Sequence, residues 1–271
     1  MGPDSIRSVL ITGASSGIGA ATATYLADRG FRVFGTSRRP PSQNSTDGKL
    51  TWIAMDVCDD GSVRKGFDEV LAAVPHLDAL VCCAGFGIFG SVEEVSIEAA
   101  RAQFETNFFG TLRTLRAVLP SMRTAGRGRI VIVGSLAGRA PIPFQAHYSA
   151  TKAAVDALAQ ALRTELHSTG VRVSLVEPGD IDTDFNDRMD WGDPNASAYG
   201  ERIRRVERVI RESLPKAPGP MGAARAIHRA LTARWPRVRY TAGADATLVP
   251  LARRILPDWL SLRLIRSHFH I

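Results

Sequence analysis

The sequence predicts an α/β fold in which helices cover both faces of a doubly wound parallel sheet. Short apolar runs of strand length alternate with longer segments of helical periodicity as far as residue 176. Glycine or proline turns follow several of these runs, as they do at the ligand-binding edge of open α/β sheets. A chain of 271 residues is within the range of a single α/β domain, so we expect one domain over residues 1–271.

The expected strands are apolar and are bounded by turn residues. Because helical segments follow them, right-handed crossovers should keep the strands parallel. The strands are expected at 8–12, 31–36, 50–55, 77–83, 128–133 and 171–176, with a short one around 238–241. The helices are expected after residue 19 to about 30 and at about 59–74, 96–122, 148–167, 198–214 and 222–233.

A glycine-rich turn joins the first expected strand to the first helix. Its glycines let the main chain approach a pyrophosphate, and the amide groups at the start of a helix favour negative charge. A turn of this kind, between a strand and a helix, indicates a Rossmann-type dinucleotide site. The residues expected to hold the dinucleotide there are Gly13, Ser15, Ser16, Gly17, Ile18 and Gly19.

The end of the second strand indicates which dinucleotide is bound. A carboxylate at this position binds the ribose 2′-hydroxyl of NAD, whereas arginine accommodates the 2′-phosphate of NADP. The sequence there is Ser37-Arg38-Arg39, without a carboxylate. We therefore expect NADP(H), with Arg38 as the main phosphate contact and Arg39 beside it, because a guanidinium suits phosphate geometry.

Tyr148 and Lys152 are four residues apart in a helical segment, so both side chains should lie on one helix face. An ammonium group beside a phenol favours the phenolate and lowers its pKa towards the working range of a general acid/base. The pair alone is also typical of an ordinary amphipathic helix. Ser135, at the end of the preceding strand, favours the catalytic interpretation.

Taken together, residues 6–185 resemble the short-chain dehydrogenase/reductase family. Thr12-Gly13-x-x-x-Gly17-x-Gly19 is similar to its cofactor motif. Further residues match the family's adenine, central and nicotinamide-side cofactor contacts: Asp56 with Val57, Ala84 with Gly85, and Pro178, Gly179, Ile181 and Thr183. Four more match its catalytic tetrad: Asn107, Ser135, Tyr148 and Lys152. One departure is Cys82-Cys83, where the family usually has two asparagines.

The resemblance implies hydride transfer between the nicotinamide and a carbonyl carbon. Tyr148 would exchange the proton with the oxygen, and Lys152 would lower the tyrosine pKa and hold the nicotinamide ribose. Ser135 would donate a hydrogen bond to the carbonyl oxygen. Asn107 would anchor a water that relays protons to Lys152. Thiols are poor hydrogen-bonding substitutes for asparagine, so Cys82-Cys83 should weaken cofactor binding or local rigidity rather than chemistry.

The segment 184–220 is expected to form a substrate lid, and residues 245–271 a C-terminal extension. The segment 85–90, the Pro178-Gly179 loop and the C-terminal extension together resemble the branch of the family that acts on hydroxysteroids and retinoids. This resemblance implies a lipophilic ketone or aldehyde and its alcohol as substrates. Candidates for the pocket wall are Phe86, Phe89, Leu136, Ile142, Phe144, Phe185 and Trp191, although core packing explains each equally well. The extension could pack within the protein, join two copies, cap the pocket or lie on a membrane. We favour packing or a dimer contact over membrane contact.

The formal net charge is +7, with basic clusters at 202–211 and 253–266. No nucleic-acid-binding motif accompanies them, so nucleic acid is not an expected partner. No metal-ligand spacing is present. His268 and His270, at the chain end, are expected to fray. The three cysteines do not suggest a disulfide framework, and neither a signal peptide nor an 18-residue apolar span is evident.

The lack of an evident signal peptide or membrane span predicts a cytoplasmic protein. The family resemblance implies a homodimer or homotetramer, formed through the helices that carry Asn107 and Tyr148. Two other functions fit the same sequence. One is a 3-oxoacyl reductase whose basic lid receives an acyl carrier protein or coenzyme A. The other is a non-catalytic nucleotide sensor, which the intact tetrad disfavours.

Overall fold

A computed structural model describes residues 7–41, 48–193, 195–243 and 245–271. The side chains at positions 245, 247, 250, 251 and 254 lie outside the described set. Seven strands form one sheet in the order β3-β2-β1-β4-β5-β6-β7, and every neighbouring pair is parallel. The chain order reverses beside β1, which lies between β2 and β4. This is the switch point at which doubly wound sheets bind ligands.

The strands are short and mostly buried, because helices cover both faces of the sheet. Their bounds are β1 Ser8–Thr12, β2 Arg32–Ser37, β3 Leu50–Ala54, β4 Ala79–Cys82, β5 Gly128–Val133, β6 Val171–Pro178 and β7 Arg239–Ala242. All residues of β1, β4 and β5 are buried. Such continuous burial explains why these strands are apolar runs rather than alternating ones.

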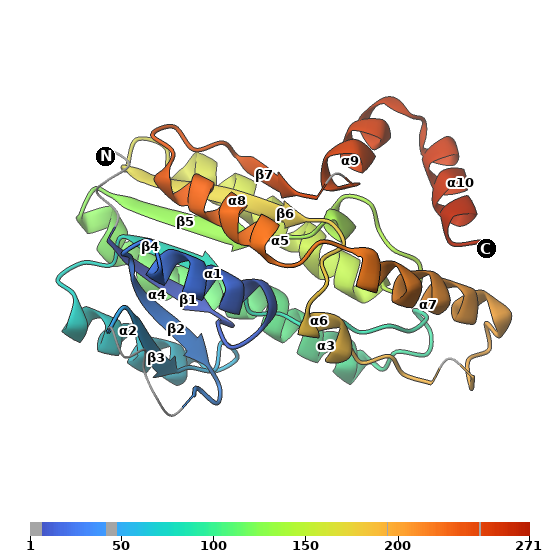
Figure 1. Cartoon of the computed structure of the whole chain (residues 1–271), viewed down its shortest axis with the longest axis horizontal. Helices are drawn as coiled ribbons and strands as arrows, with labels where there is room; N and C mark the ends of the chain where they lie inside the picture. The colour runs from blue at the N-terminus through green and yellow to red at the C-terminus, as the bar shows by residue number, and fades with distance from the viewer. Residues whose placement is uncertain (1–6, 42–47, 194, 244) are drawn as a thin grey trace.

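Successive side chains of a strand enter two different hydrophobic cores. On one face, Leu10 and Ile130 pack with α2 (Asp60–Ala73), α4 (Gly110–Thr124) and α5 (Ala146–Glu165). On the other face, the neighbouring residues Val9 and Val131 pack with α1 (Gly17–Ala27) and α8 (Met221–Thr232). Figure 1 shows α1 and α8 side by side in front of the sheet. The period-two alternation of strands thus builds both layers at once.

The expected helix over 96–122 is interrupted by a wider turn. It consists of α3 (Ile97–Phe104), a π-helical turn at Glu105–Phe109, and α4. Asn107 lies within the π turn and is buried. π turns inside α-helices are frequent at functional sites, because they re-aim one side chain without breaking the helix.

The C-terminal third of the chain covers the carboxyl ends of the strands. It contains α6 (Asp184–Asp187), α7 (Glu201–Ser213), a 3₁₀ turn at Leu214–Lys216, α9 (Asp245–Ile255) and α10 (Asp258–His268). In Figure 1, α7, α9 and α10 lie at the same end of the molecule. Pro250 lies inside α9, whereas Pro257 separates the two last helices.

The predicted α/β class, parallel sheet and covering helices are confirmed. The one-domain organisation, with a lid at 184–220 and an extension at 245–271, stays a prediction. One expectation about the extension is wrong: the chain end is not frayed, because His268 closes α10 and Phe269 is buried.

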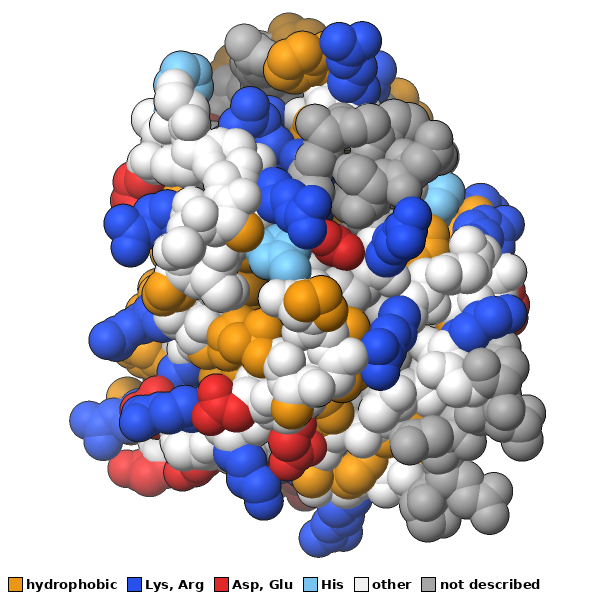
Figure 2. All heavy atoms as spheres, turned by 90° about the vertical axis from the view of Figure 1, so that its left-hand side faces the viewer, with side chains coloured by type: hydrophobic (Ala, Val, Ile, Leu, Met, Phe, Trp, Pro, Cys, Tyr) orange, Lys and Arg blue, Asp and Glu red, His pale blue; other side chains and the backbone are white. Residues whose placement is uncertain are grey.

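The described residues contain no helix that is both long and apolar enough to span a membrane. No cluster of three or more metal-ligating side chains occurs among them either. On the face in Figure 2, Lys and Arg side chains are spread among acidic and hydrophobic ones rather than gathered in one patch.

Candidate active site

A cavity of about 1260 Å³ lies at the carboxyl ends of the strands. Three of the four tetrad residues line it, namely Ser135, Tyr148 and Lys152. All residues expected to contact the cofactor line it as well: Gly13, Ser15, Ser16, Gly17, Ile18, Gly19, Arg38, Arg39, Asp56, Val57, Ala84, Gly85, Pro178, Gly179, Ile181 and Thr183. These expected site residues are up to 170 positions apart in sequence, and they meet around one space.

Two glycines of the glycine loop have no room for a side chain. A Cβ atom on Gly19 would lie 2.2 Å from the Gly13 carbonyl oxygen, and one on Gly13 would lie 2.8 Å from Ala84 Cα. Gly13 also has a left-handed φ of 64°, which favours glycine. The start of α1 faces this loop, with no acidic side chain in its first turn. The cradle therefore fits a pyrophosphate held by main-chain amides.

The ribose end of the cavity is basic. Arg38 and Arg39 follow β2 and line it. A third lining arginine, which the sequence did not single out, is Arg188 at the end of α6. It lies beside the glycine loop, where its Nη1 donates a 2.9 Å hydrogen bond to Ser16 Oγ, and its Nη2 lies 3.8 Å from Asp184 Oδ2. Asp56 and Asp180 are the only carboxylates among the described lining residues. This arginine excess suits a phosphorylated dinucleotide.

Lys152 is buried on α5, and its Nζ donates a 3.0 Å hydrogen bond to the Val133 carbonyl oxygen. Burial lowers the pKa of Lys152 to about 8. Its Nζ lies 5.8 Å from the centre of the Tyr148 ring, so the two side chains share a face as the spacing predicts. A Cβ on Gly138 would lie 2.8 Å from the Lys152 carbonyl carbon, so the turn after Ser135 packs directly on this part of α5.

The pKa of Tyr148 is raised, mainly because burial disfavours the phenolate, while a hydrogen bond with Ser135 opposes the rise. Lys152 is not among the causes. The expectation that Lys152 lowers the pKa of Tyr148 is therefore wrong for the protein alone. Burial of the phenol is the largest cause, and the Lys152 ammonium is instead directed at the Val133 carbonyl oxygen.

Asn107 lies behind the cavity wall rather than in it. Its Oδ1 accepts from the Phe86 amide at 3.0 Å, and its Nδ2 donates to the Phe86 carbonyl and to Thr151 Oγ1 at 3.0 and 3.1 Å. Both amide protons thus have partners, and the side chain holds the loop after β4 against α5. The water relay through Asn107 stays a prediction.

The unusual Cys82-Cys83 pair lies in a main chain that other residues hold. Thr12 Oγ1 accepts from the amides of Cys83 and Ala84 at 3.1 and 3.2 Å. Burial raises the pKa of both thiols, that of Cys83 to about 12, so they are neutral at physiological pH. Cys83 lines the cavity, whereas Cys82 belongs to the core of the sheet.

Only part of the expected pocket wall reaches the cavity: Phe86, Ile142 and Phe185 do. Phe89, Phe144 and Trp191 instead form a supporting cluster behind it, and Leu136 does not line the cavity. The sequence did not identify several residues of the wall, which include Gln145, Met189, Val209, Ile210, Leu214, His268 and Phe269. Among them, His268 and Phe269 show that the extension caps the pocket, the alternative that the sequence did not favour.

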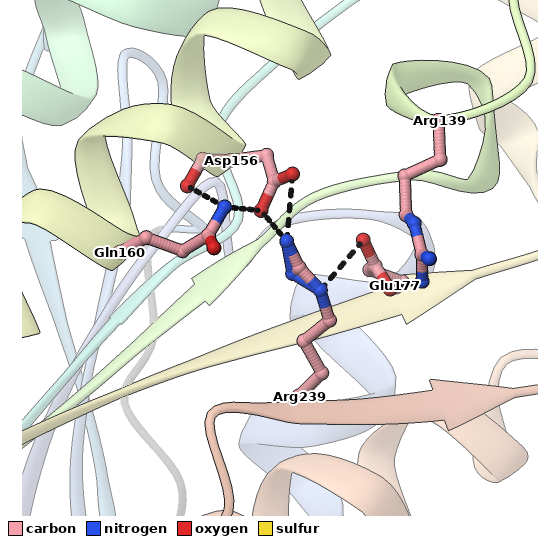
Figure 3. Close-up of polar contacts among 5 residues, drawn as sticks. All are labelled: Arg139, Asp156, Gln160, Glu177 and Arg239. Carbon is pink, nitrogen blue, oxygen red and sulfur yellow. Dashed lines mark hydrogen bonds and ion pairs between the residues drawn. The ribbon is translucent and has the colours of Figure 1, made fainter. Parts of the chain in front are cut away.

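A group of charged side chains joins the turn after Ser135, helix α5 and the strands β6 and β7 (Figure 3). Arg239 Nη2 lies 2.5 and 2.8 Å from the Asp156 carboxylate oxygens, and its Nε lies 3.8 Å from Glu177 Oε1. Arg139 Nη1 lies 3.5 Å from Glu177 Oε2. Glu177 is 1% exposed, and burial raises its pKa, although Arg239 and Arg139 oppose this.

Three of these charged residues are close in sequence to residues of the site. Arg139 follows the Ser135 turn, Asp156 is one helical turn after Lys152, and Glu177 precedes Pro178. No local pattern in the sequence identifies the group, because its members come from four separate segments.

The family model of the short-chain dehydrogenases, described as "short chain dehydrogenase", matches residues 7–192. The chain belongs to this family. It is 36% identical to "3-ketodihydrosphingosine reductase" of Bacteroides thetaiotaomicron over 97% of this chain and 98% of that protein. It is 32% identical to human "17-beta-hydroxysteroid dehydrogenase type 1" over 92% of this chain and 81% of that protein.

Solved structures of short-chain dehydrogenases agree with the fold. A short-chain dehydrogenase from Streptomyces avermitilis is similar with a TM-score of 0.81 and 31% identity, over 98% of this chain and 97% of that one. One from Burkholderia cenocepacia, solved in complex with NADP, has a TM-score of 0.76 and 27% identity, over 97% and 99% of the two chains. The similarity to the human hydroxysteroid dehydrogenase confirms the resemblance to the hydroxysteroid and retinol dehydrogenase branch, as does 36% identity to "Retinol dehydrogenase 8" of Bos taurus over 69% of this chain and 62% of that protein.

Proposed function

We propose that this short-chain dehydrogenase is an NADP(H)-dependent enzyme that interconverts a lipophilic ketone or aldehyde and its alcohol. One observation carries the proposal: Ser135, Tyr148 and Lys152 line the same cavity as the glycine loop and the arginines after β2. A single space therefore holds both the groups for proton transfer and those for a phosphorylated dinucleotide.

The preference for NADP(H) rests on charge. Arg38 and Arg39 stand where a carboxylate would bind an unphosphorylated ribose, and Arg188 adds a third guanidinium to the wall. A similar dehydrogenase from Burkholderia cenocepacia was solved with NADP, which supports the same choice.

The residues have distinct roles in the proposed reaction. The nicotinamide supplies or accepts the hydride when bound. Tyr148 gives its hydroxyl proton to the substrate oxygen on reduction and takes it back on oxidation. Ser135, which already bonds the phenol, donates to the same oxygen and stabilises the charge that develops there.

Lys152 is the basic group of the site that can change its protonation state during the reaction. With a pKa of about 8, it can hold or release a proton near physiological pH. Lys152 would hold the nicotinamide ribose hydroxyls through its ammonium, which would then turn from Val133 towards Tyr148. That movement would favour the phenolate, which the protein alone does not.

The substrate class follows from the cavity wall. Phe86, Ile142, Phe185, Val209 and Phe269 present apolar surface to the substrate side. Two similar proteins are named for long-chain and polycyclic substrates, a ketosphingoid and a steroid. We therefore propose a lipophilic carbonyl compound as the substrate.

For the whole enzyme, we propose a cytoplasmic location and a homodimer or homotetramer.

The test begins with fluorescence titration of NADPH against NADH, followed by turnover with aliphatic, aromatic and steroidal ketones. We expect tighter NADPH binding and turnover of the larger ketones. Tyr148→Phe should abolish turnover while NADPH binding stays measurable, because only the transferable proton is removed. Turnover by this variant would refute the tyrosine role, and preferred NADH binding would refute the arginine argument.

Turnover limited to acyl groups bound to a carrier protein or coenzyme A would instead support a 3-oxoacyl reductase. NADPH binding with no turnover of either substrate type would support a nucleotide sensor.

A further inference from the structure

The last two helices expose an unusual amount of apolar surface. Of the fourteen large hydrophobic side chains exposed in the described part of the chain, six lie on α9 and α10: Leu248, Val249, Ile255, Trp259, Leu262 and Leu264. Ile255 is 74% exposed and Trp259 is 64% exposed. Apolar side chains gathered in one place on a surface mark an interaction site, whereas scattered ones need no explanation.

The same helices present arginines beside these apolar groups. Arg263 and Arg266 are exposed, and they follow Trp259 by four and seven residues, so the three lie on one side of α10. Neither arginine forms an ion pair with another described residue. Ser261 and Ile265 lie on the opposite side, towards the protein.

The basic surface continues onto α7. Arg205 Nη1 donates a 3.3 Å hydrogen bond to the His270 carbonyl, which joins α7 to the chain end. Arg202 and Arg208 of the same helix are also exposed. Segments 201–216 and 245–271 contain ten Lys or Arg and five Asp or Glu, and so carry five of the seven net positive charges.

This surface borders the substrate side of the cavity. Val209, Ile210 and Leu214, from α7 and the turn after it, line the cavity together with His268 and Phe269 from the end of α10. The helices that expose apolar and basic side chains outside are therefore the ones that close the cavity from that end.

We propose that α9 and α10, with the arginine face of α7, form a peripheral membrane-binding surface that rests on an anionic bilayer. Arginine heads suit lipid phosphates, and Trp259, Leu262 and Ile255 suit the boundary between headgroups and acyl chains. A second copy fits less well, because a two-fold contact would bring the like charges of both copies together. Where the proposed lipophilic substrate holds, docking would let it pass from the bilayer into the cavity.

The test is co-sedimentation of the purified full chain with vesicles of phosphatidylcholine and phosphatidylglycerol, compared with vesicles of phosphatidylcholine alone. We expect the protein to pellet with the anionic vesicles only, and less so at high salt. W259A/L262A and R263E/R266E should each lower the partition coefficient by roughly tenfold or more, because they remove inserted apolar area or reverse the attraction.

Two variants of the same chemistry serve as controls. W235A removes a tryptophan that is 74% exposed outside this surface. R64E/K65E reverses two exposed charges on α2, at the other end of the molecule (Figure 1). Both should pellet like the wild type, and circular dichroism checks that every variant is folded.

Several results would overturn the proposal. Wild-type protein that stays in the supernatant, or pellets equally with both kinds of vesicle, would do so. So would R263E/R266E that pellets as well as its control. If light scattering shows that W259A/L262A dissociates an oligomer while pelleting is unchanged, the surface joins two copies instead. None of these measurements uses turnover, so failure here is distinguishable from failure of the proposed enzyme activity.

Discussion

Replacing Lys152 by methionine tests whether the buried ammonium destabilises the folded protein. Lys152 is 8% exposed, and within the described chain its one hydrogen-bond acceptor is the Val133 carbonyl oxygen at 3.0 Å. Methionine has nearly the same length and no charge, so it fills the site without the cost of desolvating a cation. We expect the variant to lose activity and yet to be more stable than the wild type at pH 7.

The expected magnitude follows from the pKa. Burial lowers the pKa of Lys152 from 10.5 to about 8, which corresponds to about 3 kcal/mol. The lost hydrogen bond to Val133 offsets about 1 kcal/mol of this gain. The net expected stabilisation at pH 7 is therefore about 2 kcal/mol.

The sign changes predictably with pH. Between pH 8 and 10.5 the unfolded chain binds more protons at Lys152 than the folded protein does, so wild-type stability should rise with pH across this window. The variant lacks this group, and its advantage should shrink towards pH 10. Above pH 10 Tyr148, whose pKa is raised, affects both proteins, so measurements end there.

Urea unfolding of the protein without cofactor, at pH 7, 8.5 and 10, measures the difference. Lys65→Met is the matched control, since Lys65 is exposed on α2 and its replacement should leave stability unchanged at each pH. The reasoning is refuted if the Lys152 variant is less stable than the wild type at pH 7. It is equally refuted if the difference does not fall with pH.

Three further substitutions probe other parts of the site. Gly19→Ala should raise the Kd for NADPH by roughly tenfold or more in fluorescence titration, because its Cβ would lie 2.2 Å from a carbonyl oxygen of the same loop; an unchanged Kd would contradict the phosphate-cradle assignment. Arg188→Ala should raise it by about fivefold through loss of a guanidinium beside the glycine loop, and a variant that binds NADPH as tightly as the wild type would show that Arg188 does not contact the cofactor. Arg239→Met should lower the free energy of unfolding by about 2 kcal/mol, since buried Glu177 loses a partner, whereas the exposed Arg237→Met should not; equal losses would show that the charge group adds no stability.

Much of the fold could be predicted, because apolar runs and glycine positions in the sequence determine the strands and turns locally. The strand expected at 128–133 is observed at the same residues, since burial on both faces demands an apolar run. The glycine loop could be predicted as well, because each of its glycines has either no room for a Cβ atom or a left-handed φ. The π turn at Glu105–Phe109 was not predicted, because one extra residue in a helical turn changes hydrogen-bond partners without changing composition.

The sequence predicted fewer of the residues on the substrate side of the cavity than on the cofactor side. Phe269 packs in a cluster with Phe89, Met189, Ile203 and Val206, so the contact spans most of the chain. Nothing in the last residues themselves predicts this burial, because a short terminal segment alone is expected to fray. A wall built from distant segments can be found only after the sheet has brought those segments together.

The pair Tyr148 and Lys152 shows that residue spacing predicts which side chains share a helix face but not how their pKa values shift. Spacing correctly placed both side chains on one face, but it predicted the wrong direction for the pKa of Tyr148. The direction depends on burial, and burial depends on the sheet, the Ser135 turn and the capping helices together. A helix pattern contains no information on that balance.

The structure explains how Cys82-Cys83 can replace the two asparagines that are usual in the family. Four main-chain groups after β4 are held by side chains from elsewhere: the amides of Cys83 and Ala84 by Thr12, and both groups of Phe86 by Asn107. The path of the loop therefore does not depend on which side chains stand at 82 and 83. Cys82 then serves as a small apolar core residue and Cys83 as a neutral part of the cavity wall. Asparagines can be absent here because Thr12 and Asn107 already fix the main chain beside the cofactor cavity.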